Sequence, residues 1–208
     1  MKRYVIIKPL LITALLFIVP VTIFAEEEVA DTSETTAGHS ENKEPEKSSL
    51  SDFAKGTHKW QIYGSALVGD SGKGEMYALH LGYGYFPWKR TSVNVDIFGA
   101  YINSGIHDNG VAGGFDFIIR RHFFTFEDER YSFYGDIGGG LEQQSTYFAG
   151  NRKFNFRVMA GFGGTVRISD KVRLMGGARY LHISDAGIEG GGGGYDGIQF
   201  YFGGMFPF

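Results

Sequence analysis

The sequence contains no cysteine, so neither a disulfide framework nor a thiolate metal site can hold this protein together. It also lacks a strong charge imbalance: the formal net charge is -3, which gives no reason to expect nucleic acid as a partner. The mean hydropathy is slightly negative, which argues against a membrane protein built from apolar helices. These absences leave a chain that must fold through other means.

Glycine and aromatic residues are abundant instead. There are 32 glycines, and Phe, Trp and Tyr together make up 16% of the chain. This combination is typical of a β-rich fold with glycine turns and aromatic surfaces. With 208 residues, the chain is long enough for one domain of moderate size.

The first 55 residues differ in composition from the remainder. Lys2 and Arg3 precede an apolar stretch, and Ala25 stands before three glutamates, so we expect residues 1–25 to be a signal peptide cleaved after Ala25. Residues 26–55 are rich in Glu, Thr and Ser and have few large apolar side chains, which predicts an acidic disordered tail. The folded domain is expected over residues 56–208.

Eight segments of alternating polarity follow, each about as long as a strand that crosses a bilayer. The expected strands are 59–68, 75–86, 91–102, 111–124, 131–143, 154–168, 172–184 and 198–206. One side of these segments is apolar. The other side would gather acids and arginines in nearly equal number: Asp96, Asp116, Asp136, Glu142, Arg120, Arg157, Arg167, Arg173 and Arg179. A narrow lumen that excludes water requires such a balance.

Two further features separate a membrane barrel from a soluble sandwich. The connections alternate between short and long, as in bacterial barrels with short periplasmic turns and long external loops. The chain also ends with aromatic residues at alternate positions, Phe200, Phe202, Phe206 and Phe208, which resembles the assembly signal of outer-membrane proteins. The prediction is an all-β fold, an eight-stranded antiparallel transmembrane β-barrel in the bacterial outer membrane, in contact with outer-membrane lipid.

A histidine and a serine end the seventh expected strand, within RYLHISDAGI. Because side chains alternate across a strand, His182 and Ser184 share its lipid-facing side, at the external rim. An imidazole and a hydroxyl there can meet a lipid head group or an ester near it. The alternative is that both are ordinary interfacial residues, as polar side chains at a membrane surface often are.

The stretch ARYLHISDAGI, followed by DGIQF and a terminal aromatic strand, resembles the lipid A deacylase family of outer-membrane barrels, which are similar to acyloxyacyl hydrolases and remove a 3-O-linked chain. The family's pattern is His-x-Ser-Asn-Ala-Gly, then a loop, then Gly-Ile-Glu. The resemblance implies that Ser184 attacks the ester and that His182 is the general base. The sequence departs from the pattern at Asp185, whose charge would be a poor neighbour for an oxyanion, and at Gln199.

The third member of such a triad should be an acid that orients the imidazole. Asp196 has the outward parity of Phe200 and Phe202 and is the preferred candidate. Gln199 is the alternative from the family alignment, although its parity is inward, and Glu189 is a weaker loop alternative. Asp196 is equally well interpreted as an ordinary turn aspartate that precedes Gly197.

The sequence therefore predicts an outer-membrane serine esterase that removes an ester-linked acyl chain from the lipid A of lipopolysaccharide, without a cofactor or metal. A non-catalytic structural barrel or adhesin with a degenerate site stays open as the alternative, favoured by Asp185 and Gln199. A pore is disfavoured because side chains fill the lumen of eight strands. The sequence does not predict the oligomeric state.

Overall fold

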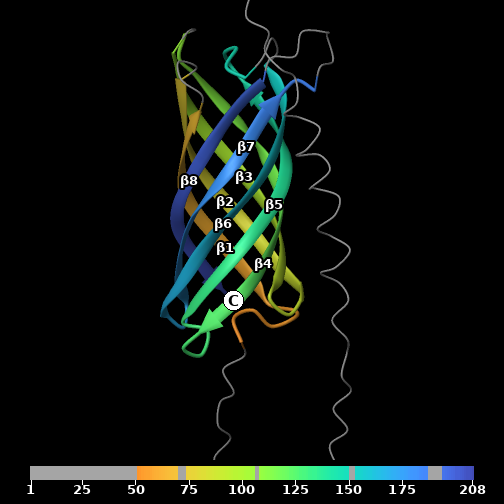
Figure 1. The fold of residues 1–208 in the computed structure, drawn as a ribbon, viewed down its shortest axis with the longest axis vertical. Helices are drawn as coiled ribbons and strands as arrows, with labels where there is room; N and C mark the ends of the chain where they lie inside the picture. Colours follow the sequence, from red (N-terminus) through yellow and green to blue (C-terminus); the bar gives the residue numbers. More distant parts are fainter. Residues whose placement is uncertain (1–50, 70–73, 106–107, 150–152, 187–193) are drawn as a thin grey trace, which may run out of the picture. The chain divides into compact units, whose positions relative to one another are not determined.

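Eight strands form one closed antiparallel barrel in the computed structural model, which describes residues 51–69, 74–105, 108–149, 153–186 and 194–208. Each strand pairs with the next along the chain, and the last closes onto the first (Figure 1). The strands are β1 (His58–Gly69), β2 (Gly74–Trp88), β3 (Thr91–Ser104), β4 (Gly110–Phe126), β5 (Tyr131–Gln144), β6 (Phe154–Ser169), β7 (Val172–Ser184) and β8 (Gly194–Pro207). The predicted fold is confirmed. The expected signal peptide and residues 26–50 of the expected tail lie outside the described residues.

The eighth strand is longer than its sequence pattern indicates. It begins at Gly194 rather than Ile198, so four more residues pair with the end of β7. Asp196 therefore lies within a strand and not in a loop or turn. This extension fixes the direction of its side chain.

The short connections lie at the end of the barrel that holds both termini of the folded unit. Lys59 near the start of β1 pairs with Pro207 near the end of β8. Turns of two, four and two residues join β2 to β3, β4 to β5 and β6 to β7 at this end. By the asymmetry of bacterial barrels, this end is periplasmic, and the opposite end, where β7 finishes, is external.

Ion pairs and aromatic rings fill the lumen. Asp136 on β5 accepts hydrogen bonds from Arg179, at 2.9 Å, and from Arg120, at 3.2 Å. Arg157 donates to Glu142 at 2.6 Å and to Asp116 at 2.8 Å. These side chains are buried, and arginine forks hold carboxylates well in such a setting. The predicted interior set is confirmed except for Arg167, which is partly exposed and donates to the backbone oxygen of Asp128 at the periplasmic rim.

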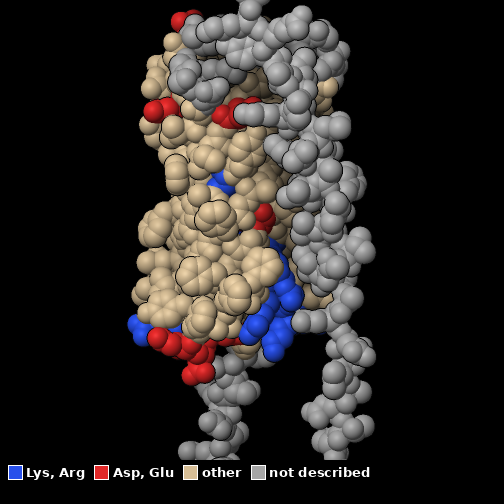
Figure 2. All heavy atoms as spheres, in the orientation of Figure 1, with Lys and Arg blue, Asp and Glu red and all other residues tan. Residues whose placement is uncertain are grey.

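The outer surface carries the apolar side chains. Leu79, Phe162 and Phe202, for example, are 65%, 73% and 65% exposed. On the face shown in Figure 2, most Lys, Arg, Asp and Glu side chains gather at the lower end, with isolated charged atoms higher up. A surface of this kind is stable against hydrocarbon and not against water. Among the described residues, no helix is long and apolar enough to cross a membrane.

The folded unit begins earlier than the sequence indicates. Composition places residues 51–55 in the tail, yet Phe53 is fully buried at the periplasmic end and its ring stacks on His122, with 4.0 Å between ring centroids. Asp52 forms an ion pair with Arg173, and Lys59 Nζ lies 4.4 Å from the centre of the Phe53 ring. One aromatic side chain within a polar segment is enough to anchor it, and composition averages conceal such a residue.

Candidate active site

The external end of β7 presents three polar side chains on the outside of the barrel. Tyr180, His182 and Ser184 alternate with Leu181 and Ile183, which are fully buried in the lumen. The outward orientation predicted for His182 and Ser184 is therefore what the structure shows. Across the β7–β8 ladder, His182 lies opposite Asp196, and Ser184 lies opposite Gly194.

His182 and Asp196 form a hydrogen-bonded pair on this outer surface. His182 Nδ1 lies 2.8 Å from Asp196 Oδ1, and their side chains are 40% and 52% exposed. An ionised carboxylate can only accept, so Nδ1 is the nitrogen that donates. In the neutral imidazole, Nε2 then carries the free lone pair. The pair thus has the arrangement that a general base and its orienting acid require.

Tyr180 is a further member of the cluster, and the sequence reasoning missed it. Its hydroxyl donates a hydrogen bond to Asp196 Oδ1, the same oxygen that accepts from His182. Two donors on one carboxylate oxygen restrict its rotation. The signal was available, because Tyr180 has the outward parity of His182, but a tyrosine near a membrane surface needs no special explanation.

Gly194 provides the space that the imidazole occupies. A Cβ atom built on Gly194 would lie 2.9 Å from His182 Cε1 and 3.7 Å from Nε2. The edge of the ring that carries Nε2 therefore lies over the residue directly opposite Ser184. The ring is thus held with Nδ1 toward Asp196 and Nε2 toward the external rim.

Ser184 lies on the same outer face, two residues along β7 from His182 and closer to the external rim. Among the described residues, no hydrogen bond joins its hydroxyl to His182. Residues two apart on one face of a strand are adjacent, and rotation about a single side-chain bond moves a serine hydroxyl. Bonds between catalytic groups are often long before substrate binds, and they tighten in the reactive complex.

The alternative third member, Gln199, does not reach this cluster. It is buried in the lumen at 2% exposure and donates to Ser65 Oγ at 3.1 Å. β8 continues without a bulge and keeps Gln199 on the inner face, so the structure does not bring this alternative to His182. Asp185 is also 2% exposed, so it is buried away from solvent rather than displayed beside Ser184. Glu189 lies outside the described residues.

Two other histidines lie in the lumen and are engaged there. His80 Nε2 and Ser65 Oγ are 2.9 Å apart, and His122 Nδ1 and Ser132 Oγ are also 2.9 Å apart. Within the described part of the chain, no group of three His, Asp or Glu side chains could hold a metal ion. These pairs therefore belong to the hydrogen bonding of the interior.

Solved structures resemble this barrel, although no known protein family and no curated protein matches the sequence. The outer membrane enzyme PagL has a TM-score of 0.59 and 17% identity, with 71% of this chain and 99% of that chain covered. Neisserial surface protein A (NspA) has a TM-score of 0.58 and 14% identity, with 74% and 98% covered. OprG from Pseudomonas aeruginosa has a TM-score of 0.50 and 10% identity, with 74% and 97% covered. The chain is an eight-stranded outer-membrane barrel.

The position of the polar cluster in an outer-membrane barrel determines what it can contact. It lies on the lipid-facing side of β7 and β8, at the end opposite the two termini. By the loop asymmetry of bacterial barrels, this is the external end of the barrel. Below the cluster on β7 come Ala178 and Gly176, which leave the surface low between the exposed rings of Phe162 and Phe202.

Proposed function

We propose that this protein is a serine esterase that removes an ester-linked acyl chain from a lipid of the outer leaflet, with Ser184 as nucleophile, His182 as general base and Asp196 as the orienting acid. The observation that carries the proposal is the His182–Asp196 hydrogen bond on the lipid-facing surface, one ladder row from Ser184. The arginine–carboxylate pairs between strands face the lumen, whereas this pair faces outward. Other side-chain pairs on the outer face, such as His58 with Tyr83 and Tyr77 with Glu75, do not combine an imidazole with a carboxylate.

The chemistry follows the geometry. Ser184 Oγ attacks the ester carbonyl while His182 Nε2 takes the hydroxyl proton, and Asp196 stabilises the imidazolium through Nδ1. The imidazolium then returns the proton to the leaving alkoxide, which departs as the sugar hydroxyl and leaves an acyl-serine. Water, deprotonated by His182, releases the fatty acid and restores Ser184. Tyr180 holds the carboxylate in place and does not touch the reacting atoms.

The substrate class is inferred from depth and from the sequence resemblance. A site on the outer wall at the external rim receives substrates that diffuse laterally in the outer leaflet. Lipid A carries ester-linked acyl chains at this level, and HISDAG resembles the motif of the lipid A deacylases. The barrel fold is shared with the outer membrane enzyme PagL and with NspA, so the fold is compatible with an enzyme and does not select the substrate.

The test is hydrolysis of purified lipopolysaccharide by the full-length protein in detergent micelles, with released hydroxy fatty acid measured by mass spectrometry. Ser184→Ala and His182→Ala should abolish release. Ser65→Ala is the matched control, because it removes a serine hydroxyl that lies 2.9 Å from a histidine inside the lumen. It should keep full activity. Full activity of Ser184→Ala would exclude the proposed mechanism.

A structural barrel without catalysis is the second candidate, and it is favoured because no hydrogen bond joins Ser184 to His182 among the described residues. The same assay decides between them. A folded wild-type protein that releases no acid from lipopolysaccharide or from simpler acyl esters would support the structural role.

A further inference from the structure

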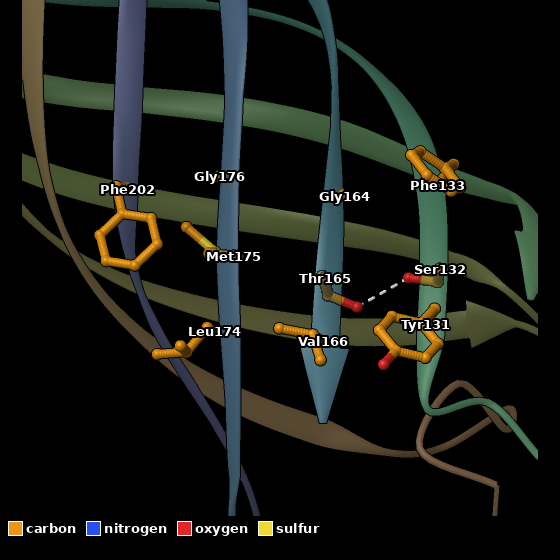
Figure 3. A pocket seen from close by; sticks show the side chains of 10 residues that line it. All are labelled: Tyr131, Ser132, Phe133, Gly164, Thr165, Val166, Leu174, Met175, Gly176 and Phe202. Carbon is orange, nitrogen blue, oxygen red and sulfur yellow. Dashed lines mark hydrogen bonds between the residues drawn. The ribbon is translucent and has the colours of Figure 1, made fainter. Parts of the chain in front are cut away.

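A second feature of the outer surface lies near the periplasmic end, far from the proposed active site. It is a hollow of about 190 Å³ formed by β5, β6, β7 and β8. Its floor is Gly164 and Gly176, which are partners across the β6–β7 ladder. Phe133 and Phe202 flank the two glycines in the same row of the sheet. Figure 3 shows the two rings on either side of the glycine positions.

The lower boundary of the hollow is the next ladder row. Tyr131, Val166 and Leu174 form a ledge on the periplasmic side, as Figure 3 shows. The upper side is low on β7, where Ala178 follows Gly176. The hollow is thus a short groove closed at the bottom, and toward the membrane centre it is open over β7, between Phe162 on β6 and Phe200 on β8. Its polar lining residues, Ser132 and Thr165, bond to each other at 2.7 Å and are buried in the lumen.

Paired glycines facing lipid require a reason, because glycine weakens a strand interior and contributes no side chain to the surface. Phe133 and Phe202 are 57% and 65% exposed and rise on both sides of the glycines. Without an occupant, the walls would lose contacts on the side that faces the gap. Strands are spaced about 4.8 Å apart, so the two-strand floor is roughly 10 Å across before the flanking rings narrow it. This is too narrow for an α-helix, which is about 10–12 Å wide with its side chains, and wide enough for an extended hydrocarbon chain.

The depth of the hollow selects the leaflet. Gly176 is eight residues below Ser184 on β7, which is roughly 27 Å along a strand at about 3.4 Å per residue. With a strand tilt of about 40°, this corresponds to roughly 20 Å along the membrane normal. Half of the hydrocarbon core is about 15 Å thick. A chain attached to a head group at the level of Ser184 therefore ends above the glycines, and the hollow lies in the periplasmic leaflet.

We propose that the groove over Gly164 and Gly176 binds one acyl chain of a glycerophospholipid from the periplasmic leaflet. Charged residues of both signs stand where its head group would lie. Arg130 lies over the Tyr131 ring at 5.5 Å and pairs with Glu127 at 3.8 Å, and Asp170 and Lys171 form the β6–β7 turn just below the ledge. Such a mixture suits a zwitterionic head group. A second barrel is a poorer occupant, since a stable protein interface needs about 1,200 Å² or more of buried surface. The proposal is independent of the esterase activity.

The test uses the full-length protein in mild detergent, incubated with a defined phosphatidylethanolamine or, in a separate sample, with lipopolysaccharide, and measured by native mass spectrometry. Gly176→Leu fills the groove. Gly99→Leu is the matched control, because Gly99 also faces lipid but a Cβ atom built on it would have no other atom within 4 Å. Wild type and Gly99→Leu should retain one phospholipid per barrel, and Gly176→Leu should retain at least tenfold less.

Three outcomes would overturn the proposal. They are equal phospholipid retention by wild type and Gly176→Leu, a dimer that Gly176→Leu abolishes, and wild-type retention of lipopolysaccharide alone. If Gly176→Leu does not fold, the wild type in liposomes still decides the matter. A phosphatidylethanolamine with a photoreactive group in its acyl chain should form adducts with Phe133 or Phe202, and adducts spread evenly around the barrel would contradict the proposal.

Discussion

Gly194→Ala should inactivate the proposed esterase without disturbing the barrel. Gly194 has no left-handed backbone conformation, so alanine can adopt its geometry. The new methyl group would lie 2.9 Å from His182 Cε1, whereas nonbonded carbons are comfortable at about 3.5–4.0 Å. The imidazole must therefore move by roughly 0.6–1.1 Å. A displacement of this size in a catalytic group costs on the order of 10²-fold in rate.

The assay for this prediction is the initial rate of hydroxy fatty acid release from lipopolysaccharide. Gly99→Ala serves as the control, because a methyl group there meets no atom within 4 Å. Folding is checked for both variants by the shift in gel mobility on heating. We expect Gly99→Ala to match wild type and Gly194→Ala to lose about two orders of magnitude. An unchanged rate in Gly194→Ala, together with an inactive Ser184→Ala, would refute the assigned position of the imidazole.

Four further predictions concern the site and the interior. Asp196→Asn should lower kcat by about 10³–10⁴-fold because an amide cannot stabilise the imidazolium. Gln199→Ala should not change the rate in the same release assay. A loss of rate in Gln199→Ala, with an unchanged rate in Asp196→Asn, would make Gln199 the third member of the triad. Tyr180→Phe removes one hydrogen-bond donor to Asp196. Because such a bond contributes about 1 kcal/mol, kcat should fall by about fivefold with KM unchanged. A change confined to KM would indicate a role in substrate binding instead. Asp136→Ala leaves Arg120 and Arg179 without their shared carboxylate and should lower the free energy of unfolding in urea by about 3–5 kcal/mol; a loss below about 1 kcal/mol would show that water screens the lumen. Phe53→Ala should cost about 3–5 kcal/mol in the same measurement, and no loss would place residues 51–55 outside the folded unit.

Most of the barrel could be predicted from the sequence because each strand has one face in hydrocarbon and one in a filled lumen. That contrast gives alternation with period two, and it places Asp136 and Arg179 on one side and Phe162 and Phe202 on the other. The ends of strands were harder to predict where glycines interrupt the alternation of polar and apolar side chains. The glycines before Tyr195 concealed the start of β8, so Asp196 could be assigned a face but not a partner.

The candidate site could be predicted only in part, for physical reasons. Parity along β7 and β8 placed His182 and Asp196 outward and Gln199 inward. Register between the strands, which no single segment encodes, is what brings His182 opposite Asp196 and Ser184 opposite Gly194. Tyr180 was missed because its hydrogen bond crosses the ladder diagonally. The catalytic roles of His182, Ser184 and Asp196 stay predictions that rest on geometry and resemblance.

Covalent labelling of the nucleophile tests the central claim most directly. The folded protein would be treated with a lipid-tailed fluorophosphonate, which phosphonylates an activated serine and releases fluoride, and the modified peptide would be located by mass spectrometry. The account predicts one adduct, on Ser184, which is lost in His182→Ala and kept in Ser65→Ala. An unlabelled wild-type protein, or an adduct on another serine, would contradict it.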